Sequence, residues 1–255
     1  MNSIQNIFQN KPSKVLSIFF TAGFPKLEDA TAIIQALSES KVDFVEVGLP
    51  FSDPLADGPT IQESSQIALQ NGMNLDLVFT QLKAIKNSHS MPLVLMGYLN
   101  QLLTYGEHQF CQACIDCGID AVILPDLPMI EYENHYKALF DSYGISNVFL
   151  ITPHTSDDRI RKIDSYTNSF IYVVASAAIT GAKGGISHQQ IAYFERIKAM
   201  KLQSNLVVGF GISDQSTFNT VCHYANGAII GSAFIKELEK KGLDGIKPFI
   251  KAILN

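Results

Sequence analysis

The sequence predicts an α/β fold, a (β/α)8 TIM barrel formed as a single domain over residues 1–255. Three observations lead to this prediction. Short apolar segments alternate with amphipathic segments in eight consecutive units, and no linker or change of composition divides the chain. The apolar segments have no polar face, as is typical of parallel strands buried on both sides. Eight such units in 255 residues are what a closed (β/α)8 barrel requires.

The predicted strands are short apolar runs, and the predicted helices follow them with a stripe of apolar residues on one face. A short extra helix is expected at the amino terminus, where Ile4, Ile7 and Phe8 share a face before Pro12. A doubly wound open sheet is the main rival, but the segment after the first strand lacks its glycine fingerprint. We expect strands at residues 15–20, 44–47, 93–96, 121–124, 148–151, 170–174, 206–208 and 228–230, and helices at 27–40, 60–70, 75–87, 107–117, 131–143, 157–165, 188–200, 215–223 and within 233–254.

Composition excludes several classes of protein. The net charge of -5 argues against a nucleic-acid-binding protein, which normally has a basic face. No run of 18 apolar residues is present, so we expect no transmembrane helix, and without a signal-peptide core we expect a cytoplasmic location. Cys111, Cys114 and Cys117 lie three residues apart without histidines at ligand spacing, so we expect buried thiols and no metal site.

Two carboxylates, Glu46 and Asp57, are the strongest candidates for chemistry. Glu46 interrupts an apolar strand, where an unpaired charge is costly, and Asp57 lies in the proline-rich loop that follows. One dry and one more solvated carboxyl group would supply an acid and a base at neutral pH. The alternative is that Glu46 pairs with a buried cation and Asp57 only forms a turn. The loop is followed by a helix for which Thr60 is the expected N-cap.

The ends of the predicted strands carry glycines that would suit a phosphate group. Gly211 follows strand seven and Gly231 follows strand eight, where barrels often bind phosphate. Ser232 is expected to cap the next helix and to donate its hydroxyl, and Gly181 would complete the ring. The glycine-rich segment after strand six is a candidate lid. Tight turns or an ordinary surface loop are the alternatives for these segments.

Taken together, these motifs resemble the tryptophan synthase alpha chain family over essentially the whole chain. The most specific is the long stretch from Glu46 to Gln62, Glu-Val-Gly-Leu-Pro-Phe-Ser-Asp-Pro-Leu-Ala-Asp-Gly-Pro-Thr-Ile-Gln. Five shorter motifs occur in the family's order, at residues 20–23, 96–98, 125–128, 209–213 and 231–233. The glycine motifs alone would fit many phosphate-binding barrels.

The resemblance implies a retro-aldol cleavage of indole-3-glycerol phosphate to indole and glyceraldehyde 3-phosphate, without a metal or organic cofactor. Glu46 matches the family's general acid and base, and Asp57 matches the carboxylate that faces the indole nitrogen. Thr180 matches the lid residue that meets Asp57. The remaining matches line the substrate pocket or hold the phosphate, namely Phe19, Tyr172 and Phe210, and Gly181, Gly211, Gly231 and Ser232. A plain core tyrosine is the alternative for Tyr172.

The resemblance also implies a partner, the pyridoxal-phosphate-dependent beta chain of tryptophan synthase, in an alpha2-beta2 complex. The pyridoxal phosphate (PLP) would belong to that partner. Positions that the family uses near this contact are Asp53, Pro54, Asn100 and Pro128. The chain departs from many members at Ala175 to Ala178 and at Gln101, where they have other lid residues and a proline. Lid closure and details of the partner contact could therefore differ.

Two other functions remain open at this point. Another phosphosugar-binding barrel enzyme, such as an isomerase or indole-glycerol-phosphate synthase, would share the phosphate site. It would not need the Asp57 loop, and the synthase would need a lysine at a strand end, where this chain has none. A non-catalytic subunit that activates a beta chain is the second alternative, against which the presence of both Glu46 and Asp57 argues.

Overall fold

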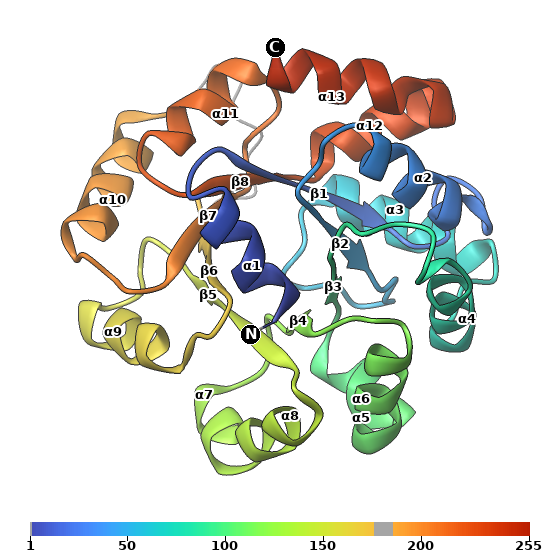
Figure 1. Ribbon diagram of the computed structural model, residues 1–255, viewed down its shortest axis with the longest axis horizontal. Coiled ribbons are helices and arrows are strands. Elements are labelled where there is room, and N and C mark those ends of the chain that lie inside the picture. Colours follow the sequence, from blue (N-terminus) through green and yellow to red (C-terminus); the bar gives the residue numbers. More distant parts are fainter. Residues whose placement is uncertain (1, 176–185) are drawn as a thin grey trace.

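The computed structural model describes residues 2–175 and 186–255, and over these residues eight parallel strands close into a barrel. Each strand pairs with the next along the chain, and the first pairs with the last. Figure 1 shows the helices as an outer ring around the strands. The predicted (β/α)8 fold is therefore confirmed. The strands are β1 (Val15–Thr21), β2 (Phe44–Gly48), β3 (Leu93–Met96), β4 (Ala121–Ile123), β5 (Ser146–Ile151), β6 (Phe170–Val174), β7 (Asn205–Gly209) and β8 (Gly227–Ile230).

The helices follow the predicted order with two differences. An additional helix, α5 (Leu99–Tyr105), stands directly after β3, and the predicted helix 131–143 is built from α7 (Met129–Glu131), a π-helical segment η1 (Tyr132–Tyr136) and α8 (Lys137–Tyr143). The others are α1 (Ser3–Asn10), α2 (Asp29–Glu39), α3 (Pro59–Gln70), α4 (Leu75–Ile85), α6 (Glu107–Asp116), α9 (Asp157–Tyr166), α10 (His188–Ala199), α11 (Gln215–Cys222), α12 (Ser232–Lys241), the 3-10 segment η2 (Gly242–Gly245) and α13 (Ile246–Leu254). None of the described helices is long and apolar enough to cross a membrane.

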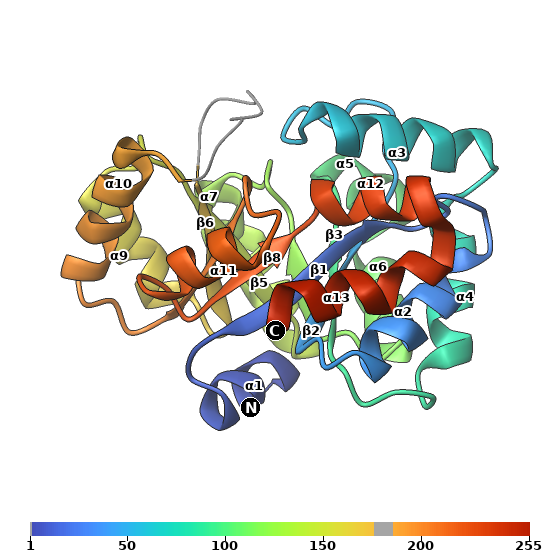
Figure 2. The ribbon, with the colours of Figure 1, turned by 90° about the horizontal axis from the view of Figure 1, so that it is seen from above.

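The amino-terminal helix α1 closes one end of the barrel. It lies across the centre of the ring in Figure 1 and below the strands in Figure 2. Ile4 and Phe8 are buried, and the Phe8 ring lies 6.3 Å from that of Phe170, at the start of β6. Ser3 donates from its backbone nitrogen and its hydroxyl to the Asp120 carboxylate, at 2.6 and 2.7 Å. The predicted helix thus seals the amino-terminal ends of the strands and leaves the opposite ends for a site.

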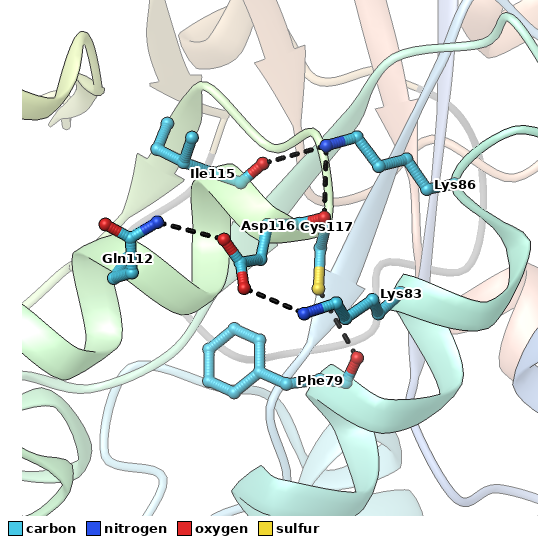
Figure 3. A network of polar contacts seen from close by, with 7 residues as sticks. All are labelled: Phe79, Lys83, Lys86, Gln112, Ile115, Asp116 and Cys117. Atoms are coloured by element: carbon cyan, nitrogen blue, oxygen red, sulfur yellow. Dashed lines mark hydrogen bonds and ion pairs between the residues drawn. The ribbon is translucent and has the colours of Figure 1, made fainter.

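The three clustered cysteines are buried thiols, as predicted. Cys111, Cys114 and Cys117 are buried, and the Cys117 thiol donates to the carbonyl of Phe79 at 3.4 Å. Around it, Lys83 bonds the Asp116 carboxylate at 2.8 Å, as Figure 3 shows. Among the described residues, no group of three or more histidine, cysteine or acidic side chains is arranged to hold a metal ion.

The helix after the proline-rich loop begins one residue earlier than expected, so the predicted Thr60 cap is wrong. Gly58 occupies the N-cap position of α3 and Pro59 is the first helical residue, with no side-chain cap. Proline suits this position because the first helical nitrogen needs no hydrogen-bond partner within the helix.

Candidate active site

Glu46 is the middle residue of β2, which pairs with β1 on one side and with β3 on the other. Its side chain is 0% exposed, and neither carboxyl oxygen has a hydrogen-bond partner among the described residues. Burial without compensation disfavours the charged form and raises the pKa of Glu46 to about 8. The alternative of a buried ion pair finds no support in these contacts. A carboxyl group that keeps its proton at neutral pH can act as a general acid.

The surroundings of Tyr172, in β6, indicate that the Glu46 side chain lies in the barrel interior. The strands β2 and β6 stand on opposite sides of the closed sheet, so side chains from both meet only across the interior. Burial, followed by the charges of Glu46 and Asp57, raises the pKa of Tyr172 well above its usual value, which places the tyrosine near both carboxyl groups. The two acidic side chains therefore share the carboxyl-terminal end of the barrel.

Asp57 is held at this end by a tyrosine that follows β3. The Tyr98 hydroxyl donates to Asp57 Oδ2 at 2.9 Å, and Gln62 Nε2 donates to the Asp57 carbonyl at 2.9 Å. Asp57 is 7% exposed, so it is wetter than Glu46 in the expected order, although both are buried. Burial raises the pKa of Asp57 to about 6 and the Tyr98 bond opposes that rise, so Asp57 is ionised at neutral pH while Glu46 is protonated.

Aromatic rings line the same end of the barrel, and two glycines make room for them. A Cβ atom at Gly48 would collide with the Phe19 ring, and one at Gly209 would collide with the Tyr172 hydroxyl. The Phe210 ring meets that of Tyr172 edge-on at 6.3 Å. Phe210 itself adopts a φ of 70°, which is rare for a side chain of this size and costs backbone strain. The three predicted pocket residues, Phe19, Tyr172 and Phe210, thus come from β1, β6 and the end of β7.

The predicted phosphate-binding residues described here lie at the ends of β7 and β8. Gly211 is exposed with a φ of 80°, and Gly231 is the N-cap of α12 without a side-chain cap. The predicted capping by Ser232 is wrong, because Ser232 is already the first helical residue. Its hydroxyl is therefore not used as a cap, and the first backbone N–H groups of α12 lack partners within the helix, as anion-binding helix ends do. Thr180, Gly181 and the candidate lid lie outside the described residues.

Comparison with known proteins identifies the family to which the chain belongs. A model of the tryptophan synthase alpha chain family matches residues 6–252. The chain is 53% identical to the tryptophan synthase alpha chain of Flavobacterium johnsoniae, over 99% of this chain and 100% of the relative. The chain belongs to the tryptophan synthase alpha chain family.

Solved structures agree with the family assignment. Tryptophan synthase subunit alpha from Legionella pneumophila has a TM-score of 0.89 at 30% identity, covering 99% of this chain and 97% of that one. An aminoacrylate-bound tryptophan synthase from M. tuberculosis has a TM-score of 0.87 at 25% identity, covering 99% and 98%. The predicted family and fold are confirmed, and with them the enzyme class, a carbon–carbon lyase of tryptophan biosynthesis.

Two residues of this site were not assigned a role from the sequence. Tyr98 belongs to a motif that matches the family, yet only the fold shows that its hydroxyl reaches Asp57. Gln101 was noted only as a departure, yet its side chain is buried beneath the proline-rich loop. The position of Tyr98 just after a predicted strand was the one signal in the sequence that could have pointed to its role. Gln101 gave no such signal, because it lies in helix α5, which the sequence did not predict.

The predicted partner-contact residues come from three neighbouring units of the barrel. Asp53 and Asn100 are exposed, Pro128 is exposed beside α7, and Pro54 is half-buried. Large apolar side chains stand exposed in the same three segments, namely Leu55 at 89%, Leu103 at 51% and Ile130 at 58%. Exposed apolar side chains rimmed by polar residues are typical of a protein–protein contact.

Proposed function

We propose that this chain cleaves indole-3-glycerol phosphate to indole and glyceraldehyde 3-phosphate, with Glu46 as general acid and base and Asp57 facing the indole nitrogen. The observation that carries the proposal is the pair of carboxyl groups at one end of the barrel, of which one is buried without a partner and the other is held by Tyr98. Their pKa values of about 8 and about 6 give one proton donor and one anion at neutral pH.

The reaction needs a proton on C3 of the indole ring before the bond from C3 to the glycerol chain can break. Glu46 donates that proton, and the ring nitrogen becomes positively charged. The Asp57 carboxylate stabilises this charge and accepts the N–H hydrogen bond. The bond then breaks with its electrons returning to the ring, while Glu46 takes the proton from the hydroxyl of the departing carbon. Indole and an aldehyde leave, and Glu46 is protonated again.

The remaining predicted site residues bind the substrate. Phe19, Tyr172 and Phe210 contact the indole ring, and Gly181, Gly211, Gly231 and Ser232 hold the phosphate. Support comes from the φ of 80° at Gly211 and from the uncapped start of α12, which present backbone N–H groups without a basic side chain. No step of this reaction requires a cofactor within this chain.

The partner is a tryptophan synthase beta chain, which holds the pyridoxal phosphate and receives the indole in a cytoplasmic alpha2-beta2 complex. The chain enters this complex as one barrel domain spanning residues 1–255. Its contact surface includes Asp53, Pro54, Asn100 and Pro128, and the exposed apolar side chains of the same segments support this assignment. Asp53 and Pro54 lie in the same loop as Asp57, so partner binding and catalysis act on the same segment.

Indole release from indole-3-glycerol phosphate tests the proposal. Glu46→Gln keeps the shape of the side chain but removes its acid and base function, so we expect turnover to fall by about 10²- to 10⁴-fold or more. Binding of glycerol 3-phosphate, measured by calorimetry, should stay within a factor of two or so of the wild-type value, because the phosphate site is left intact. Added beta chain should accelerate the wild-type enzyme.

Glu107→Gln is the matched control, because Glu107 is bonded by Tyr136 and His135 at 2.7 and 2.9 Å on the outer surface. It should release indole at the wild-type rate. Retained turnover in Glu46→Gln would remove Glu46 from its role, and a wild-type enzyme that releases no indole, alone or with a beta chain, would favour a non-catalytic subunit.

A further inference from the structure

The buried side chain of Gln101 uses both ends of its amide within the catalytic end of the barrel. Its Oε1 accepts the backbone N–H of Tyr98 at 3.0 Å, and its Nε2 donates to the carbonyl of Pro50 at 3.0 Å. Only 9% of the residue is exposed. The amide therefore joins the segment after β3 to the first residues of the proline-rich loop.

The same two segments meet a second time at Asp57. The Tyr98 hydroxyl donates to the Asp57 carboxylate at 2.9 Å and accepts the backbone N–H of Ala56 at 3.0 Å. The Phe51 ring stacks on the Tyr98 ring at 5.1 Å and 27°. Residues 98–101 thus hold the loop at its beginning through Gln101 and at its catalytic end through Tyr98.

We propose that Gln101 is a positioning residue for the cleavage reaction, acting through Tyr98 to keep the Asp57 carboxylate in place. The proposal rests on the role proposed for Asp57. Gln101 itself does not touch the reacting atoms. It fixes the distance between the two segments, and that distance decides whether the Tyr98 hydroxyl reaches Asp57.

The local backbone explains why an amide is suited to this position. The last bond between the loop and β3 runs from Leu49 N to the Met96 carbonyl at 2.7 Å, and Pro50, which has no N–H, offers only its carbonyl. The Pro50 carbonyl needs a donor and the Tyr98 N–H needs an acceptor, so one side chain that bonds both must carry both functions. Gly97 makes room for it, because a Cβ atom there would lie 2.9 Å from Gln101 Oε1.

Steady-state indole release by Gln101→Leu tests the proposal, since leucine fills similar space without either hydrogen bond. We expect kcat to fall about 5-fold with little change in KM, because misplacing a group that acts in the transition state lowers kcat. The acid limb of the pH–rate profile should move to higher pH, since a loosened Tyr98 bond no longer lowers the pKa of Asp57. Gln81→Leu is the matched control, because Gln81 Nε2 also donates to a backbone carbonyl, that of Leu27, at 3.0 Å.

A double-mutant cycle with Tyr98→Phe separates positioning from general stability. If Gln101 acts through Tyr98, adding Gln101→Leu to Tyr98→Phe should change kcat by less than about 1.5-fold. Multiplicative losses, an unmoved pH limb, or a lower melting temperature with unchanged kcat would overturn the proposal. Should Gln101→Leu not fold, Gln101→Met, which is unbranched and of similar length, answers the same question. An inactive wild-type enzyme would instead overturn the proposed function itself, so the two failures are distinguishable.

Discussion

Two carboxyl groups at opposite ends of the barrel have different surroundings. Asp120 directly precedes β4 at the amino-terminal end, and Glu46 lies in β2 near the carboxyl-terminal end. Asp120 accepts two hydrogen bonds from Ser3. Asp43, which directly precedes β2, accepts a bond from Lys11 at 2.6 Å and one from the backbone N–H of Leu16 at 2.7 Å. Glu46 has no partner among the described residues, and Asp57 has one side-chain donor, Tyr98.

This difference separates groups that stabilise the fold from groups kept available for chemistry. Paired carboxylates at the closed end tie α1 and the strand starts together. An unpaired buried carboxyl group destabilises the folded chain and persists because the surrounding barrel is stable enough to hold it. Strained backbone at Phe210 lies at the same open end. In a (β/α)8 barrel, this matches the division between a stabilising face and a catalytic face.

The largest effect that tests this comparison is expected for Asp57→Asn. The amide keeps the size of the side chain and can still accept the Tyr98 bond, but it cannot neutralise a positive charge on the indole nitrogen. We expect kcat for indole release to fall by about 10²- to 10³-fold, the usual effect of losing one electrostatic contact to a transition state. Wild-type turnover in this variant, with a loss of thermal stability in its place, would move Asp57 to the structural group.

The converse variant, Asp120→Ala, should affect stability and leave the reaction unchanged. It removes the acceptor of two Ser3 bonds, so we expect the free energy of unfolding to fall by about 1–3 kcal/mol. Denaturant titration measures this change, and kcat per folded molecule should equal that of the wild type. A reduced kcat under conditions where the variant is fully folded would show that the closed end also contributes to catalysis.

Local patterns were sufficient to predict most of the fold. Strands β3 and β6 have the predicted bounds, because each is a short apolar run with polar or glycine residues beside it. Helix α5 was missed because its seven residues are too few to show a clear apolar stripe, and its cap comes from the Tyr98–Gln101 pair, which becomes recognisable only in three dimensions.

Site residues could be predicted where the neighbouring sequence marks them, and could not where their role depends on residues far away in the chain. Glu46 could be found because a carboxylate inside an apolar strand is conspicuous in the sequence itself. The Tyr98–Asp57 bond joins residues 41 positions apart, and the Gln101–Pro50 bond spans 51 positions. Neither contact follows from composition or periodicity, because both depend on two neighbouring strands ending at the same edge of the barrel.

The smallest expected effect concerns the Tyr98 hydroxyl, which donates to the Asp57 carboxylate, whereas Glu46 has no hydrogen-bond partner among the described residues. Asp57 must be ionised to act, so kcat/KM falls as the pH drops through its pKa of about 6, while loss of the Glu46 proton forms the alkaline limb near 8. The Tyr98 bond lowers the pKa of Asp57, so Tyr98→Phe should move the acid limb to higher pH and reduce kcat/KM at pH 7 by about 10-fold. Tyr105→Phe is the control, because Tyr105 donates to Asp76 at 3.0 Å on the surface. An acid limb that stays in place in Tyr98→Phe, or moves equally in both variants, would mean that the Tyr98 bond does not set the ionisation of Asp57.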